Sequence, residues 1–526
     1  MPGADTVGEN VKPDVNPWLV AAAVILPAFM VVIDTSIATV ALPYIAGSLS
    51  ASTDEASWVL TFFLLSNAVI LPASAWFSLR FGRKRYLIAS VVVFTVSSFF
   101  CGSASSLLMI LIARLAQGVG GGGLQPLSQA ILMESFPPEK QGLAMAVFGL
   151  GVVVAPILGP TLGGWLTLHY SWRWAFYINI PVGVIAVMLI MRFIKDPPYI
   201  KNANPGKFDS IGFGLLALGL GSLQIMLDRG QQDDWFGSQL IRWLFCIMIV
   251  CLAGFVFSQL RKKKTLVDLG AFTYRNFAVG TILMFLLAAA LYAAVTLLPL
   301  YYQTVMDYSA WSAGLVVAPR GIGAIIAMPL VGLLVSKMDT RILVTAGFAI
   351  FGICSFSWGE VNLQIGPWSL VTSIVVSGFA LGMIFVPLST VTLGALPARE
   401  VGNGSALYNL MRNLGGSIGI SVAETILVRH EQLHRSQLVQ HLSPSRVVTQ
   451  NHIHWLSHLF SNFTGPAAAH TAAIAHLAHV IERQAALMSY VDDFRYVALA
   501  SFCCLPVVWM FKRVRMTTRA GAHGAE

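Results

Sequence analysis

Long runs of apolar residues, separated by short polar connections, occupy most of this chain of 526 residues. A helix that crosses the hydrocarbon core of a membrane needs about 20 predominantly apolar residues. Fourteen runs are long enough, so the pattern predicts an all-α polytopic membrane protein. The predicted spans lie near residues 17–40, 57–79, 86–104, 106–133, 141–166, 173–194, 210–228, 239–260, 276–303, 311–336, 341–359, 367–395, 404–428 and 494–514.

The composition agrees with this pattern. Hydrophobic residues make up 56% of the chain and charged residues only 11%, against roughly a quarter in soluble domains. This excludes a soluble enzyme and a nucleic-acid-binding protein, despite a net charge of +9. The cysteines lie in apolar runs without metal-ligand spacing, and there is no phosphate-binding G-x-x-x-x-G-K-[ST] loop. We therefore expect no cofactor and no direct use of ATP.

Lysine and arginine are distributed unevenly between the two sides of the membrane. With the N-terminus in the cytoplasm, 22 of the 33 Lys and Arg residues fall on the cytoplasmic side and 8 on the outer side. The positive-inside rule favours this orientation. An even number of spans returns the C-terminus to the same side, so residues 1–16 and 515–526 are predicted to be cytoplasmic tails. The remaining three cations, inside predicted spans, are Arg114, Arg320 and Arg412.

Two parts of the chain resemble each other. The spacing of Pro72, Arg80 and Lys84 recurs 257 residues later at Pro329, Lys337 and Arg341. Two similar halves of about six helices are typical of secondary transporters. The repeat predicts a first half at 17–200, two inserted helices at 201–264 and a second half at 265–514.

A carboxylate and a guanidinium interrupt two spans of the first half. Asp34 and Arg114 each lie eight or nine residues from the outer end of their helices, which at 1.5 Å per residue places both about 12–14 Å deep. A charged side chain within a membrane is costly unless it is paired or functional. The pattern leaves two interpretations: Asp34 binds protons and separates from Arg114 during the cycle, or the two form a permanent ion pair.

Four motifs carry a resemblance to a known family. They are Asp34-Thr35 followed by Ala41-Leu42-Pro43; Arg114-x-x-Gln117-Gly118-x-Gly120; Arg80-x-Gly82-Arg83-Lys84; and Ser171-Trp172-Arg173-Trp174 leading to Asn179 and Pro181. On these motifs the chain resembles the major facilitator superfamily, and within it the fourteen-span drug:proton antiporters, the EmrB/QacA-like branch. Three residues depart from the family pattern: Thr39 stands in place of an Asn, and in the loop motif Ala75 replaces the first Gly and Leu79 the Asp.

The resemblance implies a major facilitator fold with two six-helix halves and two extra central helices. It implies proton-coupling roles for Asp34, Arg114 and Glu424. A Gly-Pro-rich stretch in the fifth span resembles the antiporter motif that closes the outer side. The resemblance assigns conformational roles to Arg80, Gly82, Arg83, Lys84, Pro156, Gly159, Pro160 and Gly163. The basic cluster also suits contact with anionic membrane lipid.

A substrate cavity is expected between the halves. It should be aromatic, sparsely charged and lined by polar residues of the central spans. We predict that it includes Gln117, Gln125, Tyr292, Phe385, Tyr408, Asn409 and Arg412. Arg320 fits no motif, and either a helix C-terminus or an anionic substrate group would satisfy it.

Residues 429–493 form a long outer loop with two helical patterns, near 429–441 and 467–490, and nine of the eleven histidines. His454 and His458 are one helical turn apart, but their apolar neighbours favour packing over metal binding, so we predict no metal site. A loop of this size resembles the subgroup that works with a periplasmic adaptor and an outer-membrane channel. We therefore expect docking of such partners.

These observations predict a transporter in the bacterial inner membrane rather than an enzyme. The leading hypothesis is proton-driven export of lipophilic or amphiphilic compounds by alternating access. The alternative is a narrow-specificity exporter of an endogenous metabolite or antibiotic. A lipid-modifying membrane enzyme would need paired acids and histidines on one membrane face, and the histidine-rich loop has no such pattern.

Overall fold

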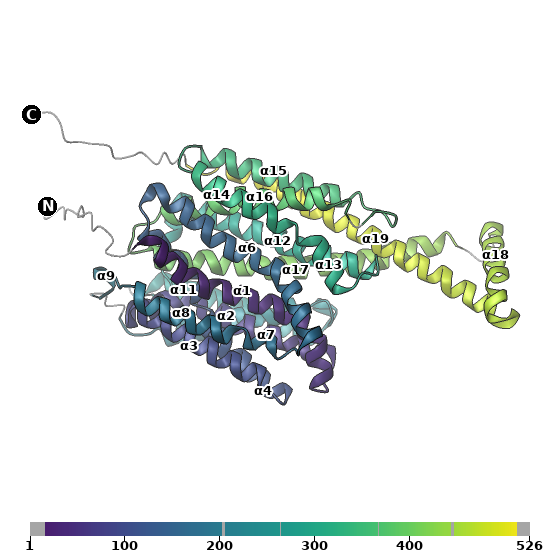
Figure 1. The fold of residues 1–526 in the computed structure, drawn as a ribbon, viewed down its shortest axis with the longest axis horizontal. Helices are drawn as coiled ribbons and strands as arrows, with labels where there is room; N and C mark the ends of the chain where they lie inside the picture. Colours follow the sequence, from purple (N-terminus) through teal and green to yellow (C-terminus); the bar gives the residue numbers. More distant parts are fainter. Residues whose placement is uncertain (1–15, 202–205, 263–264, 367, 443–445, 513–526) are drawn as a thin grey trace, which may run out of the picture.

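The computed structural model describes residues 16–201, 206–262, 265–366, 368–442 and 446–512. Most of the predicted tails at 1–16 and 515–526 therefore lie outside the described residues. Within the described ranges the chain is built from helices without any strand (Figure 1). The prediction of an all-α protein is confirmed.

The first half contains nine helices: α1 (Pro17–Ser48), α2 (Thr53–Phe81), α3 (Arg83–Gly102), α4 (Leu107–Gly121), α5 (Leu124–Ser135), α6 (Pro138–His169), α7 (Trp174–Tyr177), α8 (Asn179–Phe193) and α9 (Pro198–Lys201). Polar side chains fix several helix starts. Asn16 caps α1, and Ser52 forms a capping box with Glu55 at the start of α2.

The inserted pair is α10 (Ser210–Arg229) and α11 (Gln239–Arg261), joined through the short helix η1 (Trp235–Gly237). The second half contains η2 (Leu269–Thr273), α12 (Arg275–Thr304), α13 (Ala310–Val317), α14 (Arg320–Leu334), α15 (Thr340–Trp358), α16 (Val371–Gly394), α17 (Val401–Gln440), α18 (Val447–Thr464) and α19 (Pro466–Val508).

Eleven helices of the described chain are long and apolar enough to cross a membrane. A bent pair within α6, Pro138–Pro156 and Leu158–His169, raises the number to twelve. The predicted spans 404–428 and 494–514 fall in α17 and α19, which are more polar. Both still pack in the bundle, α17 along α12 and α19 along α15. The count of fourteen stays a prediction.

The inserted helices cover one junction between the halves. There α2 meets α17, and α10 packs against both. Ser421 of α17 donates a hydrogen bond to the Leu227 carbonyl of α10 at 2.8 Å, and Thr61 of α2 donates to Asp228. α11 packs mainly on α10 and exposes most of its apolar surface. The inserted pair therefore bridges the two halves rather than standing apart from them.

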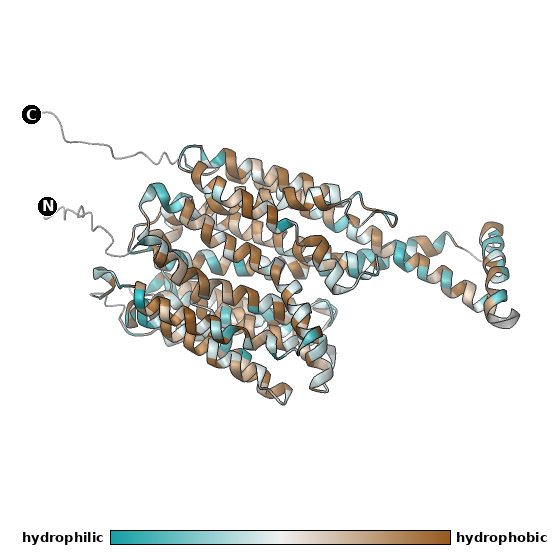
Figure 2. Cartoon of the chain, viewed as in Figure 1, coloured by the Kyte–Doolittle hydropathy of each residue, from teal (hydrophilic) through white to brown (hydrophobic). Residues whose placement is uncertain are grey.

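Two helices continue far beyond the bundle. α17 and α19 run on side by side, and α18 packs on α19 at the tip (Figure 1). The patterns predicted at 429–441 and 467–490 belong to the extended ends of α17 and α19. The sequence analysis missed α18. Figure 2 shows that polar residues are more frequent in this projection than along the bundle.

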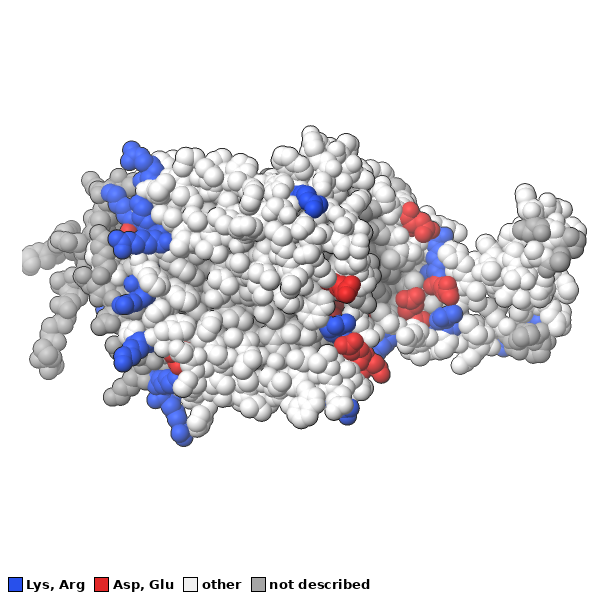
Figure 3. Space-filling model, turned by 90° about the horizontal axis from the view of Figure 1, so that it is seen from below, with Lys and Arg blue, Asp and Glu red and all other residues white. Residues whose placement is uncertain are grey.

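Charged residues are distributed unevenly between the projection and the opposite end of the bundle. On the face in Figure 3, lysine and arginine gather at the end of the bundle opposite the projection, and acids mix with basic residues near its base. A belt nearly free of charge lies between the two ends. Such a belt is what a hydrocarbon core requires.

Candidate functional site

The carboxylate of Asp34 on α1 is fully buried and is surrounded by three donors. Arg114 Nη1 lies 2.6 Å from Asp34 Oδ2 in an ion pair. Gln117 Nε2 and Asn179 Nδ2 donate to Asp34 Oδ1 at 2.9 and 2.6 Å. The predicted pairing of Asp34 with Arg114 is present, and both side chains have 0% exposed surface.

The partners of Asp34 are themselves held in place. Arg114 Nε donates to the Val59 carbonyl at 2.9 Å, and its guanidinium lies 4.5 Å from the centre of the Phe63 ring. Gln117 and Asn179 both donate to Ser98 Oγ, at 2.6 and 3.0 Å. A buried charge is tolerated when its hydrogen bonds are satisfied. Both carboxylate oxygens of Asp34 thus have donors, while Arg114 Nη2 is buried without a partner among the described residues.

Sequence reasoning missed Asn179 and Ser98 as members of this cluster. Asn179 belongs to the motif that begins at Trp172, but we interpreted that motif only as a family marker. Its position at the start of α8 aims the amide at α1. Thr39, where the family has Asn, is outside the cluster and donates to the Thr35 carbonyl instead.

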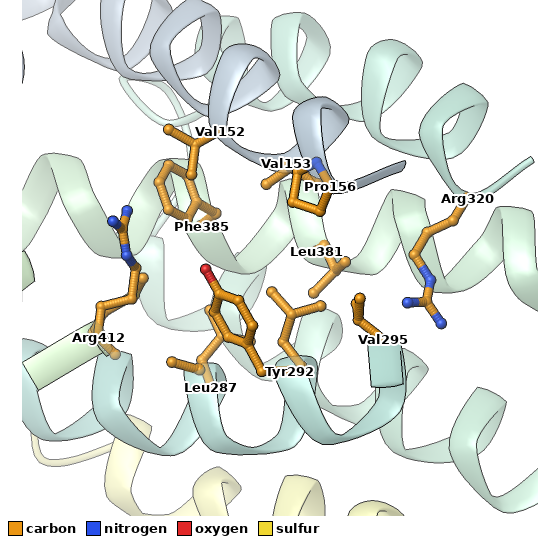
Figure 4. Close-up of a pocket in the computed structure, with 13 residues that line it drawn as sticks. Val152, Val153, Pro156, Leu287, Tyr292, Val295, Arg320, Leu381, Phe385 and Arg412 are labelled. Atoms are coloured by element: carbon orange, nitrogen blue, oxygen red, sulfur yellow. The ribbon is translucent and has the colours of Figure 1, made fainter. Parts of the chain in front are cut away.

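A small cavity of about 40 Å³ lies between the halves, with room for roughly three water molecules. Its wall is almost entirely apolar, and it is formed by α6, α12, α14, α16 and α17. Three of the predicted cavity residues line it: Tyr292, Phe385 and Arg412 (Figure 4). The halves contact each other toward both ends of the bundle. Gly142 of α6 meets Val335, and Pro160 meets Gly314.

Two buried arginines lie at opposite sides of this cavity (Figure 4). Arg320 is 1% exposed, and none of its three guanidinium nitrogens has a hydrogen-bond partner among the described residues. Its charge lies 5.4 Å from the centre of the Trp358 ring. Arg412 donates to Gln125 through Nη2, but its Nε and Nη1 are buried without a partner. An apolar cavity therefore has unsatisfied cationic donors at both sides.

The other predicted cavity residues lie elsewhere. Gln117 belongs to the Asp34 cluster, and Gln125 accepts a hydrogen bond from Arg412. Asn409 Nδ2 donates to Gln129 Oε1 at 2.5 Å, which ties α17 to α5. Tyr408 is fully buried and its hydroxyl has no partner in the described part of the chain.

Glu424 is distant from the Asp34 cluster in sequence and in its contacts. It is exposed, and it lies in the second half of α17 near Asp228 of α10. The structure thus brings Asp34 and Arg114 together and leaves Glu424 apart from them.

The basic loop between α2 and α3 contacts two acids, Glu134 of α5 and Asp196 of the connection between α8 and α9. Gly82 has a φ of +88°, a conformation that favours glycine, and a Cβ there would lie 2.7 Å from Asp196 Oδ2. Asp196 Oδ1 accepts the backbone N–H of Lys84 at 2.9 Å. Arg83 forms an ion pair with Glu134 of α5. The loop therefore has carboxylate partners although Leu79 replaces the family's Asp.

Tyr199 of α9 completes this arrangement. Its hydroxyl donates to Glu134 Oε1 at 2.7 Å and accepts from Arg83 Nη2 at 2.8 Å. Burial raises the pKa of Tyr199 well above its usual value. The hydroxyl also lies 3.5 Å from the Ala398 carbonyl of the second half. Arg80 ends α2 as an exposed residue and takes no part.

The Gly-Pro stretch lies where α6 bends by 43° beside α1. Ser36 Oγ donates to the Pro156 carbonyl at 3.1 Å. A Cβ on Gly159 would lie 2.1 Å from Ser36 Oγ, and one on Gly163 would lie 3.2 Å from Ile37 Cα. The glycines thus let α6 touch α1 two or three residues from Asp34, and Pro156 also lines the cavity.

Comparison with known proteins agrees with this architecture. The sequence profile of the Major Facilitator Superfamily matches residues 24–420. The chain belongs to this superfamily. The fold also matches two solved transporters. The human organic anion transporter MFSD10 has a TM-score of 0.57 and 14% identity, and the match covers 92% of this chain and 99% of that one. The major facilitator proton:xylose symporter XylE has a TM-score of 0.57 and 16% identity, and the match covers 92% of this chain and 94% of that one.

Closer relatives cover nearly the full length of this major facilitator protein. The multidrug export protein EmrB of Haemophilus influenzae is 36% identical over 94% of this chain and 95% of its own. EmrB of Escherichia coli is 35% identical over the same shares. The fatty acid resistance protein FarB of Neisseria gonorrhoeae is 36% identical over 93% of this chain and 94% of its own. The chain is thus a multi-pass membrane transporter, and the resemblance to the EmrB-like branch is confirmed.

Proposed function

We propose that this protein is a proton-coupled antiporter that exports lipophilic or amphiphilic compounds across the bacterial inner membrane, with both termini in the cytoplasm. Its EmrB relatives are named for multidrug export. The observation that carries the proposal is the short path between the Asp34 cluster and the cavity. Asp34 and Ser36 lie on one helix, and Ser36 holds the bend of α6 that lines the cavity.

Protonation of Asp34 is the proposed switch. A neutral carboxyl loses its attraction to Arg114, and its protonated oxygen no longer accepts as a carboxylate does from Gln117 and Asn179. Charge-assisted hydrogen bonds contribute about 1.5–3 kcal/mol each. Loss of even two of them is enough to shift a two-state equilibrium between inward-facing and outward-facing forms. The movement of α1 then reaches α6 through the contact of Ser36 with Pro156.

The apolar wall and the two arginines favour a substrate with an acidic head and an apolar body, and the cavity of about 40 Å³ would have to widen to admit it. Arg320 and Arg412 provide unpaired donors in an apolar setting, where pairing with a carboxylate is strong. The FarB relative is named for resistance to fatty acids, which are compounds of this kind. A narrow-specificity exporter of an endogenous acidic metabolite is the alternative, and it would use the same two arginines.

Glu424 is the second candidate for proton coupling. Its exposure near Asp228 suits uptake of protons at the outer end of the path rather than coupling at the cavity. We further propose that the Arg83–Glu134–Tyr199 arrangement acts as a latch between the halves, because Tyr199 reaches Ala398.

The projection is the proposed docking surface for a periplasmic adaptor, which would connect to an outer-membrane channel. Without a bound partner, five large apolar side chains of α18 would face water: Val447, Val448, Trp455, Leu459 and Phe463. Exposed apolar patches of this kind mark interaction sites. Deletion of 445–470, of which 445 lies outside the described residues, should abolish adaptor crosslinking and spare transport in vesicles. Loss of both would refute the docking role.

The test of antiport uses everted membrane vesicles with an acidic interior and a dye that reports the pH gradient. Fatty acids and neutral amphiphiles are added to vesicles with the wild-type protein or with Asp34→Asn. We expect substrate-triggered proton release with the wild type and none with the variant. Asp307→Asn, at an exposed outer acid, serves as the control and should behave as wild type. Release that persists with Asp34→Asn would move the coupling to another acid, and uptake of substrate without proton release would refute antiport.

A further inference from the structure

A second group of titratable side chains lies at the base of the projection, far from the cavity. His430 and His434 are four residues apart on α17 and therefore share one face of the helix. Asp492 of α19 faces both of them. Nδ1 of His430 and Nε2 of His434 each lie 2.8 Å from Asp492 Oδ2. The three groups thus converge on one point between two helices that are 58 residues or more apart in sequence.

We propose that His430, His434 and Asp492 bind a divalent transition-metal ion, with Zn²⁺ the best match, and that this ion joins α17 to α19. The three potential ligand atoms lie within 4.8 Å of one another. Two imidazoles and a carboxylate are a donor set that Zn²⁺ uses in proteins. The sequence analysis considered His454 and His458 and predicted no metal because their apolar neighbours favour packing. It did not single out His430 and His434, since Asp492 comes next to them only in the folded chain.

The geometry requires only a small adjustment. Zn–N and Zn–O bonds of about 2.0–2.2 Å at tetrahedral angles place neighbouring ligand atoms about 3.3 Å apart. The present separations of 2.8 Å between nitrogen and oxygen therefore need to open by about 0.5 Å, which rotation of the side chains supplies. Three protein ligands leave a fourth position for water.

The surroundings favour a cation and allow it to enter. The side chains of His430, His434 and Asp492 are 26%, 14% and 28% exposed, so the site is shielded but open to solvent. Asp493 follows directly, and its two carboxylate oxygens are buried with no partner among the described residues. The other charged groups on the facing helices include Arg429 and Glu431 of α17, a pair between Arg435 and Glu482, and a pair between Arg495 of α19 and Glu360. The arginines of the two pairs are thus already matched by acids of their own.

The position gives the ion a structural role. The site lies near the end of α12, because Thr304 of α12 is hydrogen-bonded to Tyr490 of α19, two residues before Asp492. α17 and α19 both extend beyond the bundle (Figure 1). An ion shared by both helices would fix the spacing and rotation of one against the other. The projection would then be more rigid with metal than without it. This inference does not depend on proton coupling or on the identity of the substrate.

The experiment measures Zn²⁺ binding to the full-length protein in detergent after removal of metals with a chelator. We expect calorimetry to show one tight Zn²⁺ site per chain and the unfolding temperature to rise with Zn²⁺. His430→Gln with His434→Gln should lower the affinity by more than 100-fold, since even outer-shell changes cost 10- to 100-fold. His454→Gln with His458→Gln is the matched control, another pair of histidines four apart on a helix, and should bind as wild type.

Two further measurements separate a lost site from a lost fold. Asp492→Asn keeps the shape of the side chain and should weaken Zn²⁺ binding while leaving the elution volume of the protein unchanged. Co²⁺ bound by the wild type should give the visible absorption of a four-coordinate ion, and this band should be missing in both site variants. No stoichiometric binding to the wild type, or equal binding to the His430/His434 double variant, would overturn the proposal.

Discussion

Replacing Arg320 by Met should weaken the binding of acidic substrates and stabilise the protein at the same time. Arg320 is buried with its three nitrogens unpaired among the described residues, and the ring of Trp358 lies 5.4 Å from its charge. Methionine has a similar length and no charge, so it fills the space without requiring hydrogen bonds. An unpaired buried charge is destabilising, and its replacement by an apolar side chain of similar volume is often stabilising.

The magnitude of the binding loss follows from the donors that Arg320 offers. One charge-assisted hydrogen bond to a substrate carboxylate contributes about 1.5–3 kcal/mol, and each 1.4 kcal/mol corresponds to a tenfold change in affinity. Arg320→Met should therefore lower the affinity for a fatty acid by about 10- to 150-fold. The affinity for the corresponding fatty alcohol should change little, because the alcohol has no charge to pair.

The assay compares the two ligands on purified protein, with binding measured by calorimetry and stability by the unfolding temperature. Arg242→Met is the control, because Arg242 is an exposed arginine of α11 outside the cavity. Equal losses for acid and alcohol would refute the role of the charge. An unchanged affinity for the acid together with a lower unfolding temperature would show that Arg320 is a structural residue.

Three further changes test other parts of the molecule. Glu134→Gln removes the ion pair with Arg83. It should slow transport in vesicles without changing substrate affinity in detergent. A changed affinity with an unchanged transport rate would contradict the proposed role of this ion pair as a latch. Gly159→Leu should abolish transport, because even a Cβ would lie 2.1 Å from Ser36, and full activity would contradict the need for close contact of α1 and α6. The third change concerns Asp209. Burial raises the pKa of its carboxyl, but hydrogen bonds from Lys262, Gly212 and Gln259 outweigh this effect and hold the pKa below its usual value. The stability from Asp209 is therefore present at neutral pH and is lost as the pH falls below about 4, so the unfolding temperatures of wild type and Asp209→Asn should differ at pH 7 and converge in acid.

The predicted spans and the structure agree where hydrophobicity alone decides. The runs near 276–303 and 341–359 became α12 and α15 with nearly the predicted bounds. The pairing of Asp34 with Arg114 was predictable because both are charged and lie at the same depth in the membrane. This depth follows from the number of residues between each of them and the end of its helix, which can be counted in the sequence.

Contacts that depend on how helices face each other were not predictable in this way. Asn179, Glu134 and Asp196 lie near helix ends, where polar residues are common and carry no information about their partners. Each acquires its role from a residue 51 to 145 positions away. α18 was missed because its polar residues outnumber its apolar ones along most of the run, although the apolar residues share one exposed face.

The inserted helices have a consequence for compounds that dissolve in the lipid. A bundle of two six-helix halves has two seams that open toward the bilayer, one at α2 and α17 and the other at α6 and α14. α10 covers the first seam, with α11 behind it. At the second seam α6 packs directly against α14, and within the described chain no inserted helix lies over it. The two seams therefore present different surfaces to the lipid, and the bend of α6 lies on the side that the inserted pair leaves uncovered.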